Sequence, residues 1–197
     1  MRLFVAFMPP RVATVHLAER LEIIRATKPW SARADIRWIP RERWHVTLAF
    51  LGNVDDGLIT RLTTTLGAVA ARHPMLHSLN LRGVGQFPSV LWVGVHPTQR
   101  FSPADRLARA VQRALRRDGV AIERRPWRAH VTIARLRRLH QGNDLPALSA
   151  LPALPEYAGP SWSVGEIQLI ESLTGPAPSY RVIQRFTLTG TDASTRA

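Results

Sequence analysis

A four-residue segment occurs twice in this chain, once in each half. His45-Val46-Thr47-Leu48 returns as His130-Val131-Thr132-Ile133, 85 positions later in a chain of 197 residues. In a β-strand successive side chains point to opposite faces, so the histidine and threonine of each copy share one face while the aliphatic residues take the other. The repeat therefore predicts two equivalent strands, each burying aliphatic side chains and presenting an imidazole and a hydroxyl.

Hydrophobic periodicity predicts three helices and eight strands. Apolar residues recur every three or four positions over the helical segments 11–26, 57–72 and 103–117. Apolar, β-branched and aromatic residues indicate strands over 3–7, 36–39, 46–51, 79–84, 90–95, 129–136, 162–173 and 180–188. We expect loops over 28–35 and 141–161, the second containing a short strand.

This order of elements predicts an α+β fold. Because the repeat divides the chain into similar halves, we expect two pseudo-symmetric lobes. Antiparallel sheets would carry the helices on their outer faces and leave a central cleft between the lobes. Residues 1–190 are expected to form a single two-lobed domain, and residues 191–197 a flexible tail.

The chain is strongly basic, with a net charge of +13 and a pI near 11.7. Of its 27 basic residues only Lys28 is a lysine. Arginine forms bidentate contacts with phosphate and stacks on bases, so this charge favours a polyanion, with nucleic acid as the first candidate. A genome-wide bias toward arginine would explain the scarcity of lysine. It would not explain why acidic residues number only 14.

Several classes of protein and site are excluded by what the sequence lacks. There is no cysteine, which excludes disulfides, thiol nucleophiles and cysteine-based zinc sites. No apolar run approaches the roughly 18 residues of a transmembrane helix, and residues 1–8 are too short for a signal peptide. We therefore expect a cytoplasmic protein that does not bind membranes. Phosphate-binding glycine loops and the Gly-x-Ser-x-Gly elbow are also absent.

The repeated motif has the chemistry of acid–base catalysis. An unperturbed histidine titrates near ~6.5, so one of two imidazoles facing a cleft can donate a proton while the other accepts one. Threonine hydroxyls donate to anionic oxygens, so each histidine–threonine pair could hold a phosphate. A duplicated strand without a catalytic role would give the same pattern. The basic, tryptophan-containing stretches before the two copies, at 41–44 and 124–128, favour function.

A metal site is a weak alternative, because neither copy has a carboxylate or cysteine beside its histidine. We therefore predict no metal and no cofactor. The remaining histidines are expected to be surface groups: His16, His73, His77, His96 and His140.

At these residues the chain resembles the two-histidine phosphoesterase superfamily. Within that superfamily it is most similar to the RNA 2′,3′-cyclic phosphodiesterases, also called the 2′-5′ RNA ligase family. The resemblance covers nearly the whole chain, and its stretches are 2–6, 44–52, 83–88, 90–95, 125–135, 167–172 and Tyr180. It implies a two-lobed α+β fold with a central cleft and a reaction that requires no metal.

The resemblance also implies a reaction and residue roles. The family opens a terminal 2′,3′-cyclic phosphate on RNA to leave a 2′-phosphate. His45 would be the general acid that protonates the departing 3′ oxygen, and His130 the general base that activates water. Thr47 and Thr132 would hold the non-bridging phosphate oxygens. The same geometry run backwards, with a 5′-hydroxyl in place of water, would give 2′-5′ ligation.

Two further roles follow from the resemblance, and both conflict with strand periodicity. Arg135 corresponds to an arginine at the substrate, and Phe50 to an aromatic residue near the terminal base. Each lies five positions after a motif histidine. Strict alternation therefore places both side chains on the face opposite His45 and His130, so that either the strands bend there or these two roles do not transfer to this chain.

Two other functions remain open on these residues. The chain could be a non-catalytic basic RNA-binding module. It could also be a two-histidine phosphodiesterase acting on small cyclic nucleotides or on 2′-5′ oligoadenylates. The expected partner is RNA with 2′,3′-cyclic phosphate ends, with tRNA halves as one candidate. We expect a monomer with no obligate protein partner.

Overall fold

The predicted alternation of strands and helices is present in the computed structural model, which describes residues 1–27, 36–97, 102–136, 156–173, 175 and 179–191. Its helices are α1 (Arg11–Ala26), α2 (Ile59–Ala70) and α3 (Pro103–Arg117), with 3-10 turns η2 (Arg41–Arg43) and η3 (Asp56–Leu58). Its strands are β1 (Arg2–Phe7), β2 (Ile36–Trp38), β3 (Val46–Asn53), β4 (Leu76–Phe87), β5 (Val90–His96), β6 (His130–Leu136), β7 (Trp162–Val164), β8 (Glu166–Leu173) and β9 (Ser179–Thr187).

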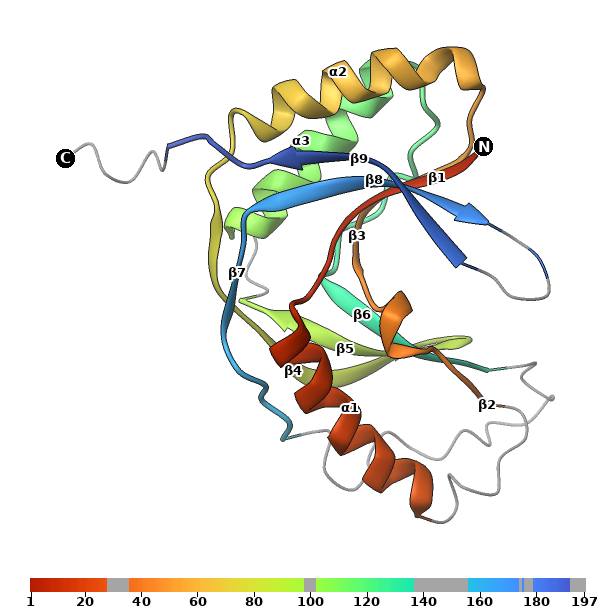
Figure 1. The fold of residues 1–197 in the computed structure, drawn as a ribbon, viewed down its shortest axis with the longest axis vertical. Helices are drawn as coiled ribbons and strands as arrows, with labels where there is room; N and C mark the ends of the chain where they lie inside the picture. Colours follow the sequence, from red (N-terminus) through yellow and green to blue (C-terminus); the bar gives the residue numbers. More distant parts are fainter. Residues whose placement is uncertain (28–35, 98–101, 137–155, 174, 176–178, 192–197) are drawn as a thin grey trace.

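The strands in the described part of the chain form one curled, antiparallel sheet with a seam at its centre. Its order is β7-β4-β5-β6-β3-β1-β8-β9, with β2 paired to β6 off this path. The two central strands, β3 and β6, share the single register pair Val46↔Val131. This pair is the seam between the strand group that ends in β6 and the group that begins with β3. Figure 1 shows the two groups diverging from it as separate layers.

The two halves repeat one unit of strand, helix and strand. In the first half the unit is β1–α1–β3, and in the second it is β5–α3–β6. Within each unit the two strands are antiparallel neighbours. The α+β class and the pseudo-symmetric arrangement predicted from the repeat are therefore confirmed, although the expected separate sheets are joined at the seam.

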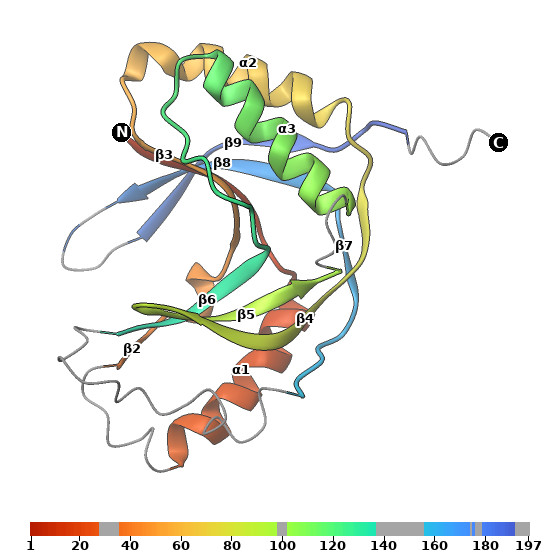
Figure 2. The ribbon, with the colours of Figure 1, turned by 180° about the vertical axis from the view of Figure 1, so that it is seen from behind.

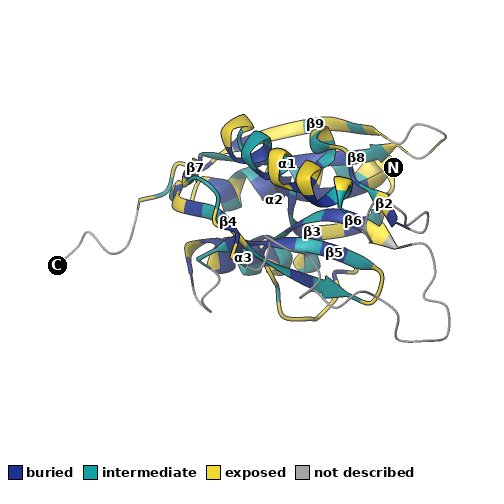
Figure 3. Ribbon diagram, turned by 90° about the horizontal axis from the view of Figure 1, so that it is seen from below, coloured by how far each residue is buried: buried dark blue, intermediate teal, exposed yellow. Residues whose placement is uncertain are grey.

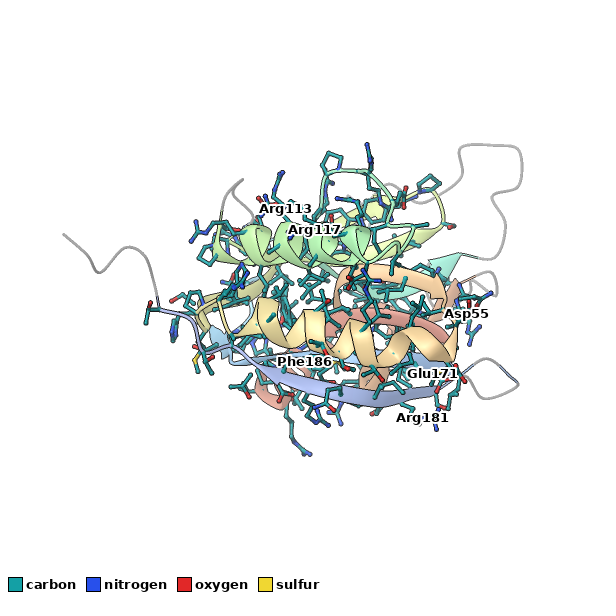
Figure 4. All side chains as sticks on the ribbon, turned by 90° about the horizontal axis from the view of Figure 1, so that it is seen from above. Asp55, Arg113, Arg117, Glu171, Arg181 and Phe186 are labelled. Carbon is teal, nitrogen blue, oxygen red and sulfur yellow. The ribbon has the colours of Figure 1, made fainter. Side chains whose placement is uncertain are left out.

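The helices lie on the outer faces of the sheet and are exchanged between the halves. Helix α1 belongs to the first unit but covers the layer of β4, β5 and β6, whereas α3 belongs to the second unit and covers the layer of β3 (Figures 1 and 2). Helix α2 lies beside α3, with Phe186 of β9 beneath it (Figure 4). The exchange means that each layer is covered by a helix from the other repeat.

Each helix buries one face for a reason visible in its spacing. Helix α1 buries Leu17, Leu21 and Ile24, and α3 buries Leu107 and Val111, at the three- and four-residue steps that bring side chains to one side of a helix. The resulting dark inner and light outer surfaces are visible in Figure 3. These residues and the sheet face that the helices cover form one large apolar cluster that spans both halves.

Local details differ from the predicted boundaries. The second helix begins as the 3-10 turn η3 and ends at Ala70, two residues before the predicted end. The single strand predicted over 162–173 is divided at Gly165 into β7 and β8. The segments 28–35 and 141–155 lie outside the described residues, as does the predicted tail beyond Thr191. In the described segments no helix combines the length and apolar character needed to cross a membrane.

The seam predicts where the fold is most sensitive to loss of volume. Val46 and Val131 are both fully buried, so Val46→Ala and Val131→Ala should each lower the free energy of unfolding by about 2 kcal/mol, through lost burial and an unfilled cavity. Urea unfolding would measure this. Val12→Ala is the control, because Val12 is 58% exposed on α1 and its truncation should have little effect. Equal losses of unfolding free energy in all three variants would contradict the prediction that the seam is more sensitive than the exposed face of α1.

Candidate active site

The seam brings the two copies of the motif together. Because Val46 lies directly opposite Val131 in an antiparallel pair, His45 stands across from Thr132, and Thr47 across from His130. Both valines are fully buried in the core. The four polar side chains therefore share the opposite face of the sheet, as alternation predicted. Cross-strand neighbours in such a pair are separated by about 5 Å between Cβ atoms, so the four side chains form one cluster.

Each histidine is held by the same backbone contact. The Nδ1 atom of His45 lies 2.7 Å from the carbonyl oxygen of Arg43, and the Nδ1 atom of His130 lies 2.7 Å from that of Arg128. A carbonyl oxygen only accepts hydrogen bonds, so both rings must donate from Nδ1. In the neutral tautomer this leaves Nε2 as the unprotonated nitrogen of each ring, available to accept or carry a proton.

Aromatic rings flank each histidine. The ring of His45 lies 4.8 Å from Phe4 and meets Tyr180 edge-on at 5.2 Å between centroids. The ring of His130 meets Phe87 edge-on at 5.2 Å and lies 5.9 Å from Trp92. Each imidazole is thus flanked by two aromatic rings.

The arginine two positions before each histidine has a double role. The guanidinium of Arg43 lies over the ring of Tyr180 at 5.0 Å, and that of Arg128 lies over Trp92 at 5.5 Å. The same two residues supply the carbonyls that orient the imidazoles. Sequence reasoning noted these basic stretches without assigning this role. The shared −2 position in both copies is the signal that would have identified it.

The two strands carry β-bulges at equivalent positions. Against β1, Val5 pairs with Ala49 and Ala6 with Thr47, which leaves Leu48 as the extra residue of β3. Against β5, Leu91 pairs with Ala134 and Trp92 with Thr132, which leaves Ile133 as the extra residue of β6. Each extra residue lies three positions after a motif histidine. A bulge inserts one residue and so reverses the alternation beyond it.

The reversal explains where Phe50 and Arg135 lie. Leu48 and Ala49 are both buried, as are Ile133 and Ala134, so two consecutive side chains enter the core in each strand. Phe50 then emerges 49% exposed and lines the same cleft as Thr47 and His130.

Arg135 is exposed, and its charge acts on His45. Of the two alternatives left open by the sequence, the irregular strand is the one observed, and strict alternation is wrong for Phe50 and Arg135. Nothing in the sequence marks the bulges, because Leu and Ile fit a regular strand equally well.

Two members of this cluster, Thr47 and His130, line a cleft of about 1010 Å³, whereas His45 and Thr132 are not part of its lining. Its lining includes Thr47, Phe50 and His130 and continues to His96, which the sequence predicted to be a surface group. One wall is the segment that precedes β6. Trp127 in this segment lines the cleft and donates its indole N–H to the carbonyl oxygen of Thr47 at 2.8 Å. This hydrogen bond connects the segment that precedes His130 to β3, the strand that follows His45.

The surroundings of the histidines keep them neutral in the protein alone. Burial lowers the pKa of His45 to about 4, and the positive charges of His130, Arg43 and Arg135 act in the same direction, against the opposing hydrogen bond to Arg43. Burial also lowers the pKa of His130, assisted by the charges of Arg125 and Arg128. An anion placed between the two rings would act in the opposite direction and favour protonation.

The donor set does not resemble a metal site. Among residues the structure describes, no three histidine, cysteine, aspartate or glutamate side chains are grouped closely enough to hold a metal ion. The cluster instead combines imidazoles, hydroxyls and an arginine. These groups donate hydrogen bonds to anionic oxygens and transfer protons.

Comparison with known proteins gives a family match that contains both copies of the repeat. A family model described as the 2′-5′ RNA ligase superfamily matches residues 10–176. An RNA 2′,3′-cyclic phosphodiesterase of Geobacillus stearothermophilus is 35% identical over 158 residues, which cover 78% of this chain and 48% of that protein. The chain thus spans about half the length of this relative. A protein of the same name from Methanothermobacter thermautotrophicus is 28% identical over 167 residues, covering 80% of this chain and 85% of the relative.

Solved structures share the architecture. TT0787 of Thermus thermophilus gives a TM-score of 0.74 at 23% identity, over 96% of this chain and 99% of that one. LigT of E. coli, in a complex with 3′-AMP, gives 0.71 at 26% identity, over 95% and 98% of the two chains. The similarity extends over both halves of the sheet.

The neutral, buried state of His45 predicts a stability that depends on pH. Its folded pKa of about 4 is below the unfolded value near ~6.5, so the unfolded state binds more protons between these values. The free energy of unfolding should therefore fall as the pH is lowered from about 6.5 to about 4, by up to about 3 kcal/mol from this residue.

Urea unfolding at intervals between about pH 7.5 and 4.5 would measure the effect. Carboxylates also titrate in this range, so the informative quantity is the difference between the wild type and His45→Gln. The variant should lose less stability on acidification. An identical pH dependence in both proteins would contradict the assignment.

Proposed function

The chain belongs to the 2′-5′ RNA ligase superfamily, and on this premise we propose that it hydrolyses the terminal 2′,3′-cyclic phosphate of RNA to a 2′-phosphate without a metal ion. One observation carries the proposal. Two histidine–threonine pairs share one face of the sheet at its seam, and each histidine has Nδ1 bonded to a carbonyl and Nε2 without a hydrogen bond among the described residues. The names of two relatives, both RNA 2′,3′-cyclic phosphodiesterases, support this class of substrate.

The two Nε2 atoms supply the proton transfers. His130 accepts a proton from water as the water oxygen attacks phosphorus. The bond between phosphorus and the 3′ oxygen then breaks, and His45 donates its Nε2 proton to that oxygen. The products are a 2′-phosphate and a free 3′-hydroxyl. His45 must be protonated to begin, and the negative phosphodiester beside it raises its pKa in the complex.

The remaining residues of the cluster stabilise charge and position the substrate. The hydroxyls of Thr47 and Thr132 donate to the two non-bridging oxygens, on which negative charge increases as the pentavalent transition state forms. Arg135 adds a positive charge on the same face. Phe50, whose ring is overlain by the guanidinium of Arg2 at 5.2 Å, offers an apolar face on which the terminal base can stack.

RNA is the proposed substrate class because the charge of the chain favours a polyanion. The net charge of +13 is carried almost entirely by arginine. With a 5′-hydroxyl in place of water, the same proton transfers run backwards and form a 2′-5′ phosphodiester. We propose this ligation as a second, reversible activity. We also propose that the protein acts in the cytoplasm as a monomer, with tRNA halves among its substrates.

Removing either histidine should abolish hydrolysis. His45→Ala and His130→Ala should each lower kcat/KM on an oligonucleotide ending in a 2′,3′-cyclic phosphate by about 10²–10⁴-fold, the usual contribution of a general acid or base. The reaction is run in EDTA, and the position of the product phosphate is identified by NMR or by comparison with 2′- and 3′-phosphate standards. We expect a 2′-phosphate and no loss of rate in the chelator.

The matched control is His77→Ala, because His77 is exposed and lies on β4 away from the cleft lining. It should retain wild-type activity. Circular dichroism of every variant separates lost chemistry from lost folding. Full activity in a folded His45→Ala or His130→Ala protein would overturn the mechanism. RNA binding without hydrolysis, unaffected by either change, would identify the chain as a binding module.

The lowered pKa values predict an acid-shifted rate profile. The pH dependence of kcat/KM reports the free protein, in which burial lowers the pKa of both His45 and His130. The profile should therefore be bell-shaped with its maximum below about pH 6.5. Bound phosphate raises the same pKa values, so the kcat profile should lie at higher pH. Coincident profiles, or a flat kcat/KM between about pH 5 and 9, would argue against paired histidines.

A further inference from the structure

The cleft continues well beyond the paired histidines. Its volume of about 1010 Å³ is at the upper end of the roughly 300–1,000 Å³ range of small-molecule sites. A single nucleotide between His130 and Phe50 occupies only one end of it. The other end is lined by Arg82 and His96, neither of which has a part in the proposed hydrolysis.

A row of residues across three strands connects the two ends. Arg82 of β4 pairs with Gly94 of β5, and Gly94 pairs with His130 of β6. Residues directly opposite one another in a sheet share a face, so Arg82 and His130 lie on the same surface. They are two strand spacings apart, roughly 10 Å. His96 lies two positions after Gly94 on β5, and so it lies on this face as well.

The glycine in the middle of the row keeps the surface open. A Cβ atom at position 94 would lie 2.8 Å from the carbonyl oxygen of Arg82 and 3.6 Å from Nε2 of His96. The first distance is shorter than side chains tolerate, so a larger residue would displace the backbone of β4. With glycine there, the floor between His130 and Arg82 is backbone flanked by the side chains of His96 and Trp92, whose ring lies 3.7 Å from the same Cβ position, and a ligand can lie between these side chains.

The charges at this end of the cleft favour an anion. Arg82 is exposed and forms no ion pair within the described residues. The two acidic residues of the cleft lining are already paired with arginines. Asp105 lies 2.8 Å from Arg109, and Glu123 lies 3.2 Å from Arg125.

We propose that Arg82 and His96 form a second phosphate subsite, which binds the phosphodiester joining the last two nucleotides of the RNA. This inference rests on the proposed function, which places the terminal cyclic phosphate between His45 and His130. The chain then leaves the terminal ribose through its 5′ oxygen, and the next phosphate crosses Gly94 to Arg82. Arginine contacts a phosphodiester through two N–H groups, and His96 adds a third donor. The subsite makes the protein selective for oligonucleotides over cyclic mononucleotides.

The test compares two substrates with the same terminal base: a nucleoside 2′,3′-cyclic phosphate and the dinucleotide ending in it. In the wild type, kcat/KM should be higher for the dinucleotide. In Arg82→Gln the dinucleotide-to-mononucleotide ratio should fall roughly tenfold, the effect of one lost charged hydrogen bond. Arg82→Lys keeps the positive charge but lacks the two parallel N–H donors of the guanidinium, so it should give an intermediate ratio. The dependence of log(kcat/KM) on log salt should weaken in Arg82→Gln by about 0.7.

Arg113→Gln is the charge-matched control. Arg113, labelled on α3 in Figure 4, is exposed and is not among the residues that line the cleft, so its loss removes a charge without changing the subsite. It should keep the wild-type ratio. An unchanged ratio in Arg82→Gln, or equal losses in Arg82→Gln and Arg113→Gln, would overturn the subsite while leaving the proposed function intact. Failure of the wild type to hydrolyse either substrate would overturn the proposed function and the subsite together.

Discussion

The arrangement of the molecule depends on one contact between two strands, the pairing of Val46 with Val131. Two layers of strands meet there and nowhere else along β3 and β6 in the described register. Because both valines point into the core, the residues on either side of them must point out of it. The same contact therefore joins the layers and exposes two imidazoles and two hydroxyls together. A shift of one residue in this register would bury the histidines and expose the valines.

The two repeats have equivalent strands and helices, but the side chains around the two histidines differ. Both rings donate to the carbonyl two positions back, and both are flanked by an aromatic pair with an arginine over one member. His45, however, lies over the small apolar cluster of Phe4, Ala6 and Ile170, whereas His130 opens onto the long cleft. Two equivalent residues thus acquire different solvation and neighbours. That difference suits a reaction in which one imidazole gives a proton and the other takes one.

Periodicity and the repeat were sufficient to predict the class of fold, most element boundaries and the four polar residues at the seam. The predicted helix over 103–117 coincides with α3, because Ser102 accepts a hydrogen bond from Asp105 and Pro103 follows it, and both signals are local. What the sequence could not supply depends on pairing between distant strands. The bulges at Leu48 and Ile133 are defined by their partners on β1 and β5, so a single strand shows no sign that alternation reverses.

The exchange of helices between the halves bears on how the chain folds. Strand β4 is covered by α1 of the first repeat and strand β3 by α3 of the second, while α2 covers β8 and β9, so neither strand-helix-strand unit encloses an apolar core by itself. A fragment containing only one repeat would leave the outer face of its sheet in water. We therefore expect native structure in one repeat to require native structure in the other. For the same reason we expect the two walls of the cleft to unfold together, because opening one wall would also uncover the core of the opposite half.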